Sequence, residues 1–393
     1  MKILVLNAGS SSLRFKLFES RGWKTLFTGH VDGIGVVATC RLRGDSEKKI
    51  FVRSHTQALQ VALDALRERG LEQIDAIGHR VVHGGEKYQK PTLLTARILK
   101  DLTQLNHLAP LHNPPNLEGI RAGAKLLPKL SNIAVFDTAF HATLPENAYL
   151  YGLPYELTRK HNIRKFGFHG ISHAYVSEQA IRWLRAHKKP HKNLLTCHIG
   201  NGVSITAIRH GKSVDTSMGF TPLEGAMMGT RSGDFDPALI PFLSKKLKKN
   251  AAHIEHLANH ESGLLGLSGI SSDMRPLWDI LQKPHHRGHI KVKRAYNLYI
   301  YRLAKQIAAQ AVALDSPDAL VFTAGIGENA WYVRRDVCAH LSHLGFKLDA
   351  RKNRFTCEGK DGPIHAPQSP AILVIKTNEE LKIAKETVRA LST

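Results

Sequence analysis

The chain reads ILVLNAGSSS at residues 3–12 and LLTCHIGNGVS at residues 194–204. In each stretch an apolar strand runs into a turn of small, hydrogen-bonding residues, and a second strand returns over residues 13–18 and 205–208. The repetition of this hairpin indicates a duplicated domain whose two turns could face each other across a cleft. Two unrelated β-hairpins remain the alternative on this pattern alone.

Helices and strands alternate in the second half of the chain. Residues 292–314 have the apolar spacing of a helix. One face of that helix would carry Tyr296, Ile300, Leu303, Ile307, Ala311 and Leu314. Residues 319–323 predict a buried strand that enters a glycine turn at 325–329, and the proline-rich residues 111–116 predict a loop. This alternation is typical of an α/β fold.

The length of 393 residues exceeds one ordinary core, so we expect two domains with a cleft between them. The four cysteines lie far apart without a Cys-x-x-Cys pair, which argues against disulfides and zinc and favours a reducing compartment. The apolar run at residues 3–6 is too short for a signal peptide, and no run approaches the about 20 residues of a membrane span. We therefore expect a cytoplasmic protein without a membrane partner.

The net charge of +22 would suit a nucleic-acid or anionic-membrane partner. The excess lies in short runs such as KKLKK at residues 245–249, which are typical of solvated helix faces. These runs lack the aromatic residues that single-strand binders place between their cations. We therefore expect no nucleic-acid partner, and a cationic surface that favours an anionic substrate and nucleotide.

Both glycine- and serine-rich turns can present backbone N–H groups and hydroxyls to phosphate oxygens. Arg80 and Arg231 each lie among glycines and apolar residues, where a guanidinium fork can bind carboxylate or phosphate; exposed salt bridges are the alternative. Asp137 follows the apolar segment 133–136 and could position magnesium, or cap a helix or form an ion pair instead.

Gly325 to Ala330 also fits the G-x-G-x-x-A variant of the dinucleotide fingerprint, with Asp349 where a ribose-binding acid could lie. That fingerprint normally opens a long βαβ domain, and little of the chain remains here. A nicotinamide-dependent dehydrogenase therefore stays a distant alternative, as does a nucleic-acid-binding protein.

Several short motifs occur in order along the whole chain. They are NAGSSS at 7–12, GHRVVHGGE at 78–86, LAPLHNPPN at 108–116, GFHG at 167–170, HIGNG at 198–202, MGTRSGD at 228–234, GIGEN at 325–329 and NEE at 378–380. This series resembles the successive signatures of acetate kinases, short-chain carboxylate kinases of the acetate and sugar kinase/actin-like superfamily.

The resemblance implies an α/β fold of two duplicated actin-like ATPase domains around a nucleotide cleft. Each domain would be a ribonuclease H-like mixed sheet flanked by helices. The N-terminal domain would span residues 1–138 plus 380–393. The C-terminal domain would span residues 139–379 and provide nucleotide binding and dimerisation.

The resemblance also implies the site residues by role. The residues that match catalytic positions are Asn7, Arg80, His112, Asp137, His169 and Arg231. Those that match the substrate pocket are Arg80, Val82, Leu111, Phe168 and Pro222. Those assigned to ATP are Ser10, Ser12, Arg14, His198, Ile199, Gly200, Asn201, Gly202, Asp273, Met274, Arg275, Gly325, Ile326, Gly327, Glu328 and Asn329. Asn7 and Glu379 are assigned to the metal, with Asp137 beside them. The chain departs from the expected Lys, Thr, Ser and Pro at Arg14, Ile171, Val203 and Lys376.

The activity that the resemblance implies is reversible phosphorylation of acetate by ATP, through direct in-line transfer in a homodimer with Mg²⁺, or Mn²⁺ as a second candidate metal. A carboxylate with a pKa of about 4.3 is already ionised at neutral pH, so Asp137 is not expected to act as a general base. Arg80, Arg231 and His169 would stabilise a metaphosphate-like transition state. A propionate or general short-chain acyl kinase stays the serious alternative. The sequence alone decides neither the physiological direction nor the absence of a phosphoenzyme.

Overall fold

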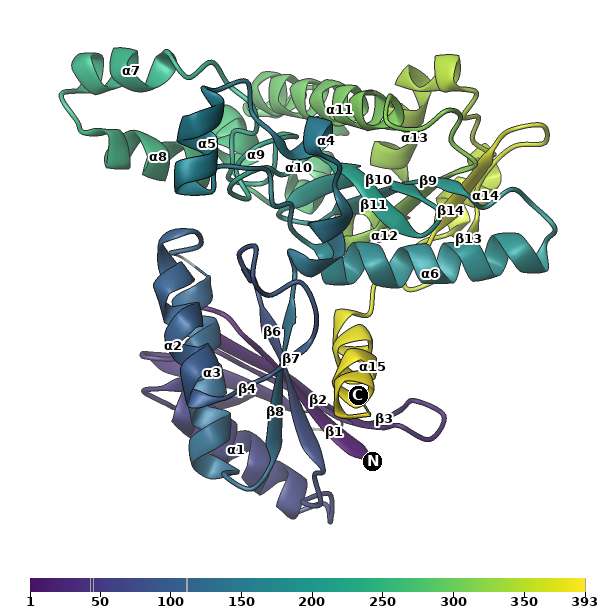
Figure 1. Ribbon diagram of the computed structural model, residues 1–393. Helices are drawn as coiled ribbons and strands as arrows, with labels where there is room; N and C mark the ends of the chain where they lie inside the picture. The colour runs from purple at the N-terminus through teal and green to yellow at the C-terminus, as the bar shows by residue number, and fades with distance from the viewer. Residues whose placement is uncertain (43, 45, 111, 393) are drawn as a thin grey trace. The chain divides into compact units, whose positions relative to one another are not determined.

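The computed structural model describes residues 1–42, 44, 46–110 and 112–392, and it divides into two compact units (Figure 1). Unit 1 comprises residues 1–142 and 378–393, and unit 2 comprises residues 143–377. The sequence places the domain boundaries slightly differently, after residues 138 and 379. Each unit is built around one mixed β-sheet.

The sheet of unit 1 has the strand order β5-β4-β3-β2-β1-β6-β8-β7. Its strands are β1 (Lys2–Ala8), β2 (Ser12–Glu19), β3 (Lys24–Asp32), β4 (Val37–Leu42), β5 (Lys48–Phe51), β6 (Ala76–Val81), β7 (Thr92–Leu93) and β8 (Ser131–Phe136). Strands β1 to β5 pair antiparallel in chain order, while β1, β6 and β8 run parallel. The first predicted hairpin is therefore confirmed.

Helices cover both faces of this sheet. They are α1 (His55–Arg67), α2 (Ala96–Gln104), α3 (Asn113–Leu126) and α15 (Glu379–Leu391), with a 3-10 turn at Leu105–His107. Adjacent residues of a strand face opposite sides of the sheet. A Cβ on Gly78 of β6 would lie 2.4 Å from the Thr387 hydroxyl of α15, whereas the neighbouring His79 lies against Gly123 of α3. The carboxyl-terminal helix and α3 thus pack on opposite faces.

The sheet of unit 2 has the strand order β11-β10-β9-β12-β14-β13. Its strands are β9 (Asn193–Ile199), β10 (Val203–Arg209), β11 (Lys212–Thr216), β12 (Ala319–Thr323), β13 (Gly362–Pro363) and β14 (Ala371–Val374). β9, β10 and β11 form an antiparallel meander, and β9, β12 and β14 run parallel. The order β11-β10-β9-β12-β14 therefore repeats β3-β2-β1-β6-β8 of unit 1. This repetition confirms the predicted duplication.

Helices also surround the sheet of unit 2 (Figure 1). They are α4 (Glu146–Tyr149), α5 (Tyr155–His161), α6 (Gly170–Ala186), α7 (Leu239–Leu247), α8 (Ala251–His260), α9 (Gly263–Ser268), α10 (Met274–Leu281), α11 (His289–Ala311), α12 (Ala324–Asn329), α13 (Trp331–His340) and α14 (Ala350–Phe355), with a 3-10 turn at Ser342–Leu344. A further 3-10 turn, Ala139–Thr143, lies where the chain passes from unit 1 to unit 2. The predicted apolar face of α11 is buried, but the helix begins at His289 and ends at Ala311, so Leu314 lies beyond it.

The secondary structure predicted for two segments is wrong. The proline-rich segment 111–116 was expected to be a loop, yet α3 begins at Asn113, because proline is tolerated in a first helical turn whose N–H groups lack partners anyway. The expected glycine turn at 325–329 is the short helix α12. There the Glu328 carboxylate accepts a hydrogen bond from the Ala324 N–H at 2.8 Å, which stabilises the helix start.

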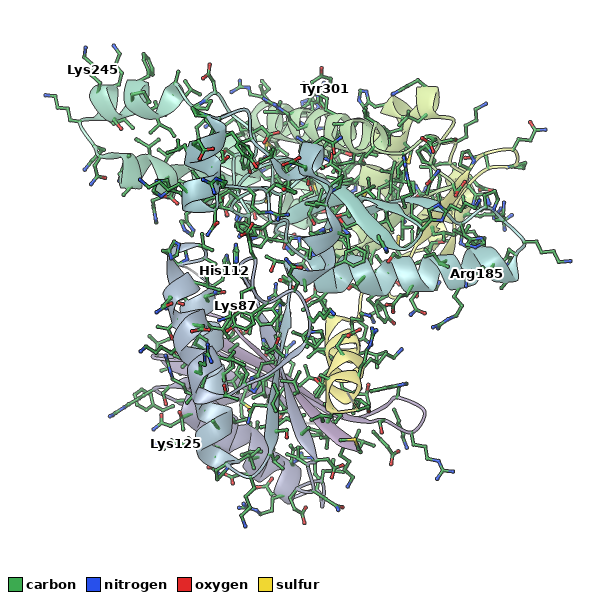
Figure 2. The ribbon with its side chains drawn as sticks, viewed as in Figure 1. Lys87, His112, Lys125, Arg185, Lys245 and Tyr301 are labelled. Carbon is green, nitrogen blue, oxygen red and sulfur yellow. The ribbon has the colours of Figure 1, made fainter. Side chains whose placement is uncertain are left out.

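Cationic side chains are spread over different elements. Lys125 lies near the end of α3, Arg185 near the end of α6 and Lys245 on α7, as Figure 2 shows. None of the helices in the described part of the chain is both long and apolar enough to cross a bilayer.

Candidate active site

The predicted site residues fall into two sets. Those up to Asp137, together with Glu379, belong to unit 1, and those from Phe168 to Asn329 belong to unit 2. Leu111, assigned to the substrate pocket, lies outside the described residues.

Three predicted residues of unit 1 meet at one edge of its sheet. Asn7 lies near the end of β1, Arg80 near the end of β6, and Asp137 directly after β8. Because these strands are parallel neighbours, their carboxyl ends lie together. The Arg80 guanidinium donates to Asp137 Oδ2 from Nε at 3.1 Å and from Nη2 at 2.5 Å, and to Asn7 Oδ1 from Nη1 at 3.4 Å.

Carboxylates around Arg80 hold it in its charged form. Burial opposes that charge, but the Coulombic attraction of Asp137, Glu379 and Glu380 outweighs it and raises the pKa of Arg80. Asp137 is only 1% exposed. The ion pair, which the sequence left open as an alternative for Asp137, is thus present, and it orients the arginine.

Glu379 begins α15 within a cluster of charges. Burial raises the pKa of Glu379, and the neighbouring Glu380 adds to this effect, while Arg80, Arg14 and Lys16 oppose it. Glu380 itself accepts a hydrogen bond from Lys16 Nζ at 2.9 Å. Two adjacent carboxyl groups in such a place would be stabilised by a bound cation.

A buried asparagine joins two segments of the unit 1 set. Asn116 of α3, 3% exposed, donates from Nδ2 to the Ala8 carbonyl at 2.6 Å and accepts from the Val82 N–H at 2.9 Å. Asn113 binds both backbone groups of His83 in the same manner. Sequence reasoning quoted these asparagines only as parts of a motif. The apolar residues beside these asparagines in the chain were the one sequence signal that could have marked them as buried.

The remaining unit 1 residues lie near these segments. Val82 directly follows β6 and is buried. His112 is the N-cap residue of α3 and is partly exposed, but its side chain does not cap the helix.

The turn between β9 and β10 organises the unit 2 set. A Cβ added to Gly202 would lie 3.2 Å from Cε1 of His169 and 3.4 Å from Nη1 of Arg231. The absence of a side chain therefore lets an imidazole and a guanidinium both approach the turn backbone. The Gly229 N–H also binds the Asn201 carbonyl at 3.0 Å, which ties the segment before Arg231 to this turn.

His169 is held by a network that sequence reasoning missed. It caps α6 with left-handed backbone, at φ 55°, and its Nδ1 lies 2.9 Å from the Ser204 hydroxyl. That hydroxyl also lies 2.7 Å from Nε2 of the buried His173. The His169 ring stacks on His198 at 4.2 Å, and His198 Nδ1 lies 2.8 Å from the Ser172 hydroxyl.

Arg231 forms no ion pair among the residues that the structure describes. Its Nη1 contacts the Pro222 carbonyl at 3.4 Å, and burial lowers its pKa. A partly buried guanidinium without a carboxylate is suited to bind an anion beside Gly202.

The predicted nucleotide residues of α12 have internal partners. Glu328 accepts from the N–H groups of Ala324 and Thr377, and burial raises its pKa. The buried Arg334, which sequence reasoning missed, donates to the carbonyls of Gly327 and Glu328 at 2.8 and 2.7 Å. Apart from its own helix, no atom of the described residues lies within 4 Å of a Cβ built on Gly325, so that glycine faces open space.

Asp273 caps α10 by accepting from the Arg275 N–H at 2.9 Å. Hydrogen bonds from the exposed Arg275 side chain lower the pKa of Asp273. Met274 between them is buried and faces the core. These two ionic side chains, rather than Met274, can meet a ligand.

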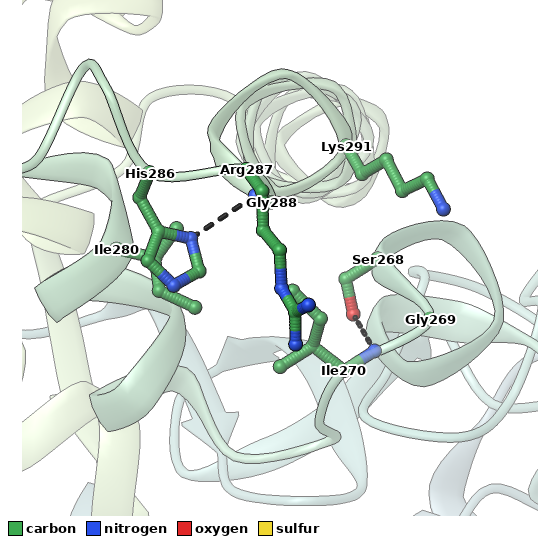
Figure 3. A pocket seen from close by; sticks show the side chains of 8 residues that line it. All are labelled: Ser268, Gly269, Ile270, Ile280, His286, Arg287, Gly288 and Lys291. Atoms are coloured by element: carbon green, nitrogen blue, oxygen red, sulfur yellow. Dashed lines mark hydrogen bonds between the residues drawn. The ribbon is translucent and has the colours of Figure 1, made fainter.

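A separate cavity of about 480 Å³ lies where α9, α10 and α11 meet, and Figure 3 shows it. Ile280, Arg287 and Lys291 line it, and none of the predicted site residues that the structure describes does.

Comparisons with known proteins agree on one family. The model described as the Acetokinase family matches residues 2–385. The acetate kinase of Thermotoga maritima is 47% identical, with 98% of each chain covered. The acetate kinase of Desulfitobacterium hafniense strain DCB-2 is 46% identical, over 99% of this chain and 98% of that protein. Among solved structures, Porphyromonas gingivalis acetate kinase has a TM-score of 0.90 at 40% identity, covering 99% of each chain. A propionate kinase from Francisella tularensis has a TM-score of 0.91 at 42% identity, covering 98% of each chain.

Proposed function

Because this chain belongs to the acetokinase family, we propose that it catalyses the reversible transfer of a phosphoryl group from Mg-ATP to acetate. The observation that carries this proposal is the placement beside Gly202 of both His169 and Arg231, which forms no ion pair among the described residues. Such a turn presents backbone and cationic donors to phosphoryl oxygens without side-chain bulk. A coupled assay tests the proposal, because ATP consumption should depend on added acetate and magnesium.

Acetate needs no general base, because it is ionised at neutral pH. The chemistry instead requires relief of repulsion between two anions. Arg231 and His169 would donate to equatorial oxygens of the phosphoryl group, and Arg80, held by Asp137, would bind the acetate carboxylate. Direct in-line transfer is the route that this set of donors supports, since none of them has to act as a covalent acceptor.

We propose that oxygen donors of unit 1 hold magnesium. Asn7 and Asp137 both contact the Arg80 guanidinium, and Glu379 attracts that group electrostatically. Mg²⁺ in kinases takes one or two carboxylates and completes its shell with waters and nucleotide phosphates. When bound, it would neutralise charge on the phosphates. Glu379 and Asp137 would hold it, and Asn7 would orient its surroundings; Mn²⁺ prefers the same oxygen ligands.

The nucleotide would bind through unit 2. Gly202 and Asn201 would contact phosphates, while Gly325, which faces open space, and the Asp273–Arg275 pair would contact the adenosine. The phosphate turn of unit 1, with Ser10, Ser12 and Arg14, would add donors.

Propionate is the second candidate substrate, because one relative of 42% identity is described as a propionate kinase. The buried Val82 favours acetate, since a β-branched side chain leaves room for a methyl group but crowds an added methylene.

We further propose a cytoplasmic homodimer. All four cysteines are free, as expected in a reducing compartment. Exposed apolar residues of α7, Leu239, Phe242 and Leu247, would suit burial against a second copy of unit 2. Light scattering should give about twice the chain mass of 43.6 kDa, and a monomer would contradict this assignment.

A further inference from the structure

His55 is a buried histidine that the mechanism above does not use. It takes the first position of α1, directly after the N-cap residue Ser54, and its side chain is 4% exposed. A protonated histidine at a helix N-terminus opposes the helix dipole, so its position requires compensating contacts.

Both ring nitrogens of His55 contact oxygen atoms. Nε2 lies 2.8 Å from the Gly9 carbonyl oxygen, and Nδ1 lies 2.8 Å from the Glu118 carboxylate of α3. A carbonyl only accepts, so Nε2 bears a proton and donates it to Gly9. The Glu118 carboxylate at Nδ1 holds the ring in the orientation in which Nε2 faces Gly9.

The partner of His55 lies in the phosphate turn at residues 7–12. Gly9 donates its own N–H to the Ser12 carbonyl at 2.8 Å, so both of its backbone groups are engaged. The Ser11 carbonyl accepts from the N–H groups of Gly33 and Ile34 at 2.8 and 2.9 Å. The turn is thus held from outside through its carbonyl oxygens.

A hydrogen bond that fixes the direction of the Gly9 carbonyl also fixes the direction of the next backbone N–H group. In a trans peptide the C=O and the following N–H point in opposite directions, and the structure has no cis peptide among the described residues. Because the Gly9 carbonyl points toward His55, the Ser10 N–H points away from it. Within the described chain that N–H has no hydrogen-bond partner, and Ser10 is exposed.

We propose that the Glu118–His55 pair is a positioning device that aims the Ser10 amide at an anionic oxygen of the transferring phosphoryl group. This inference rests on the proposed kinase activity and extends it to residues outside the family motifs quoted above. His55 and Glu118 touch no reacting atom, so they are positioning residues. Their cavity of about 410 Å³ is also lined by Arg53 and Arg121.

Variants at His55 separate positioning from packing. His55→Leu removes the donor to Gly9, and its kcat should fall about 10- to 100-fold, part of the loss expected for an oxyanion donor. His55→Gln restores a side-chain N–H, so its kcat should recover to within about 5-fold of wild type. The KM for acetate should stay near wild type in both. His107→Leu, at an exposed histidine of unit 1, is the matched control and should leave kcat unchanged.

Thermal unfolding and turnover decide the result together. A folded His55→Leu protein with wild-type kcat, or equal losses in the Leu and Gln variants, would overturn the proposal. If His55→Leu does not fold, Glu118→Ala decides instead, because it removes the partner of Nδ1, and Glu118 is 58% exposed, so that its replacement opens no core. A fall in its kcat at unchanged stability supports positioning, and wild-type kcat overturns it. Failure of the kinase assignment has a different signature, namely no acetate-dependent turnover in the wild type.

Discussion

Arg80 and Asp137 form a forked ion pair in which Nε and Nη2 of the guanidinium both donate to Oδ2 of the carboxylate. Asp137 is 1% exposed and Arg80 is 21% exposed. The pair therefore places a cation at the carboxyl edge of the unit 1 sheet and determines its orientation.

Asp137→Asn should destabilise the protein by about 3 kcal/mol, because removing one partner leaves a poorly compensated buried charge. Its kcat should fall about 100-fold or more, since Arg80 loses its orientation. Urea unfolding and the coupled assay measure both quantities. Glu156→Gln breaks an exposed ion pair with Arg159 and should change stability by less than about 1 kcal/mol. Equal effects of the two substitutions would contradict the assignment.

Arg231→Ala should lower kcat by about 1,000-fold or more, the range expected for an arginine that stabilises the phosphoryl transition state. Arg231→Lys should recover little, because a lysine lacks the planar fork. Arg287→Ala, in the separate cavity of unit 2, is the charge-matched control and should keep wild-type kcat. A folded Arg231→Ala protein with normal turnover would remove Arg231 from the phosphoryl site.

Glu379→Gln should change the way in which the stability of the protein depends on pH. The pKa of Glu379 is raised by burial and by Glu380, so the folded state binds this proton more tightly than the unfolded state. Stability from this group is therefore present below the unfolded pKa of about 4.3 and is lost as pH rises through the folded pKa. Without metal, the variant should be more stable than wild type at pH 7 and should lose this advantage near pH 4.

The same Glu379→Gln variant should need more Mg²⁺ for half-maximal activity, because it lacks one proposed ligand. Unfolding experiments in chelator and a magnesium titration give the two readouts. An unchanged magnesium requirement would argue against a metal role, whatever the effect on stability.

Val82→Ala should reduce the preference of the enzyme for acetate over propionate. One methylene in an apolar pocket contributes about 1 to 3 kcal/mol to discrimination, so wild type should favour acetate over propionate by about 10-fold or more in kcat/KM. The variant should narrow this ratio and leave the KM for ATP unchanged. An unchanged ratio would mean that Val82 only packs the strand, and a wild-type preference for propionate would change the substrate assignment.

Several site features could be predicted from the sequence because their causes are local. Strand alternation around a turn of small residues predicts the hairpins at residues 3–18 and 194–208, and both formed. The glycine at position 202 likewise predicted a turn without side-chain bulk, and the structure has it between β9 and β10. The prediction from local pattern is wrong at residues 325–329, where the glycines indicated a turn but the helix α12 is present.

Contacts between distant residues decided the rest. Ala8 and Asn116 are separated by 108 positions, and Gly9 and His55 by 46, yet each pair shares a hydrogen bond. No local periodicity marks Asn116, His55 or Arg334 as supports of a site. The sequence by itself determined the two hairpins, the duplicated order of elements and the residue types available at their turns. Only the tertiary structure decided which buried polar groups hold those turns, because a buried donor or acceptor needs a partner that folding alone brings within hydrogen-bonding distance.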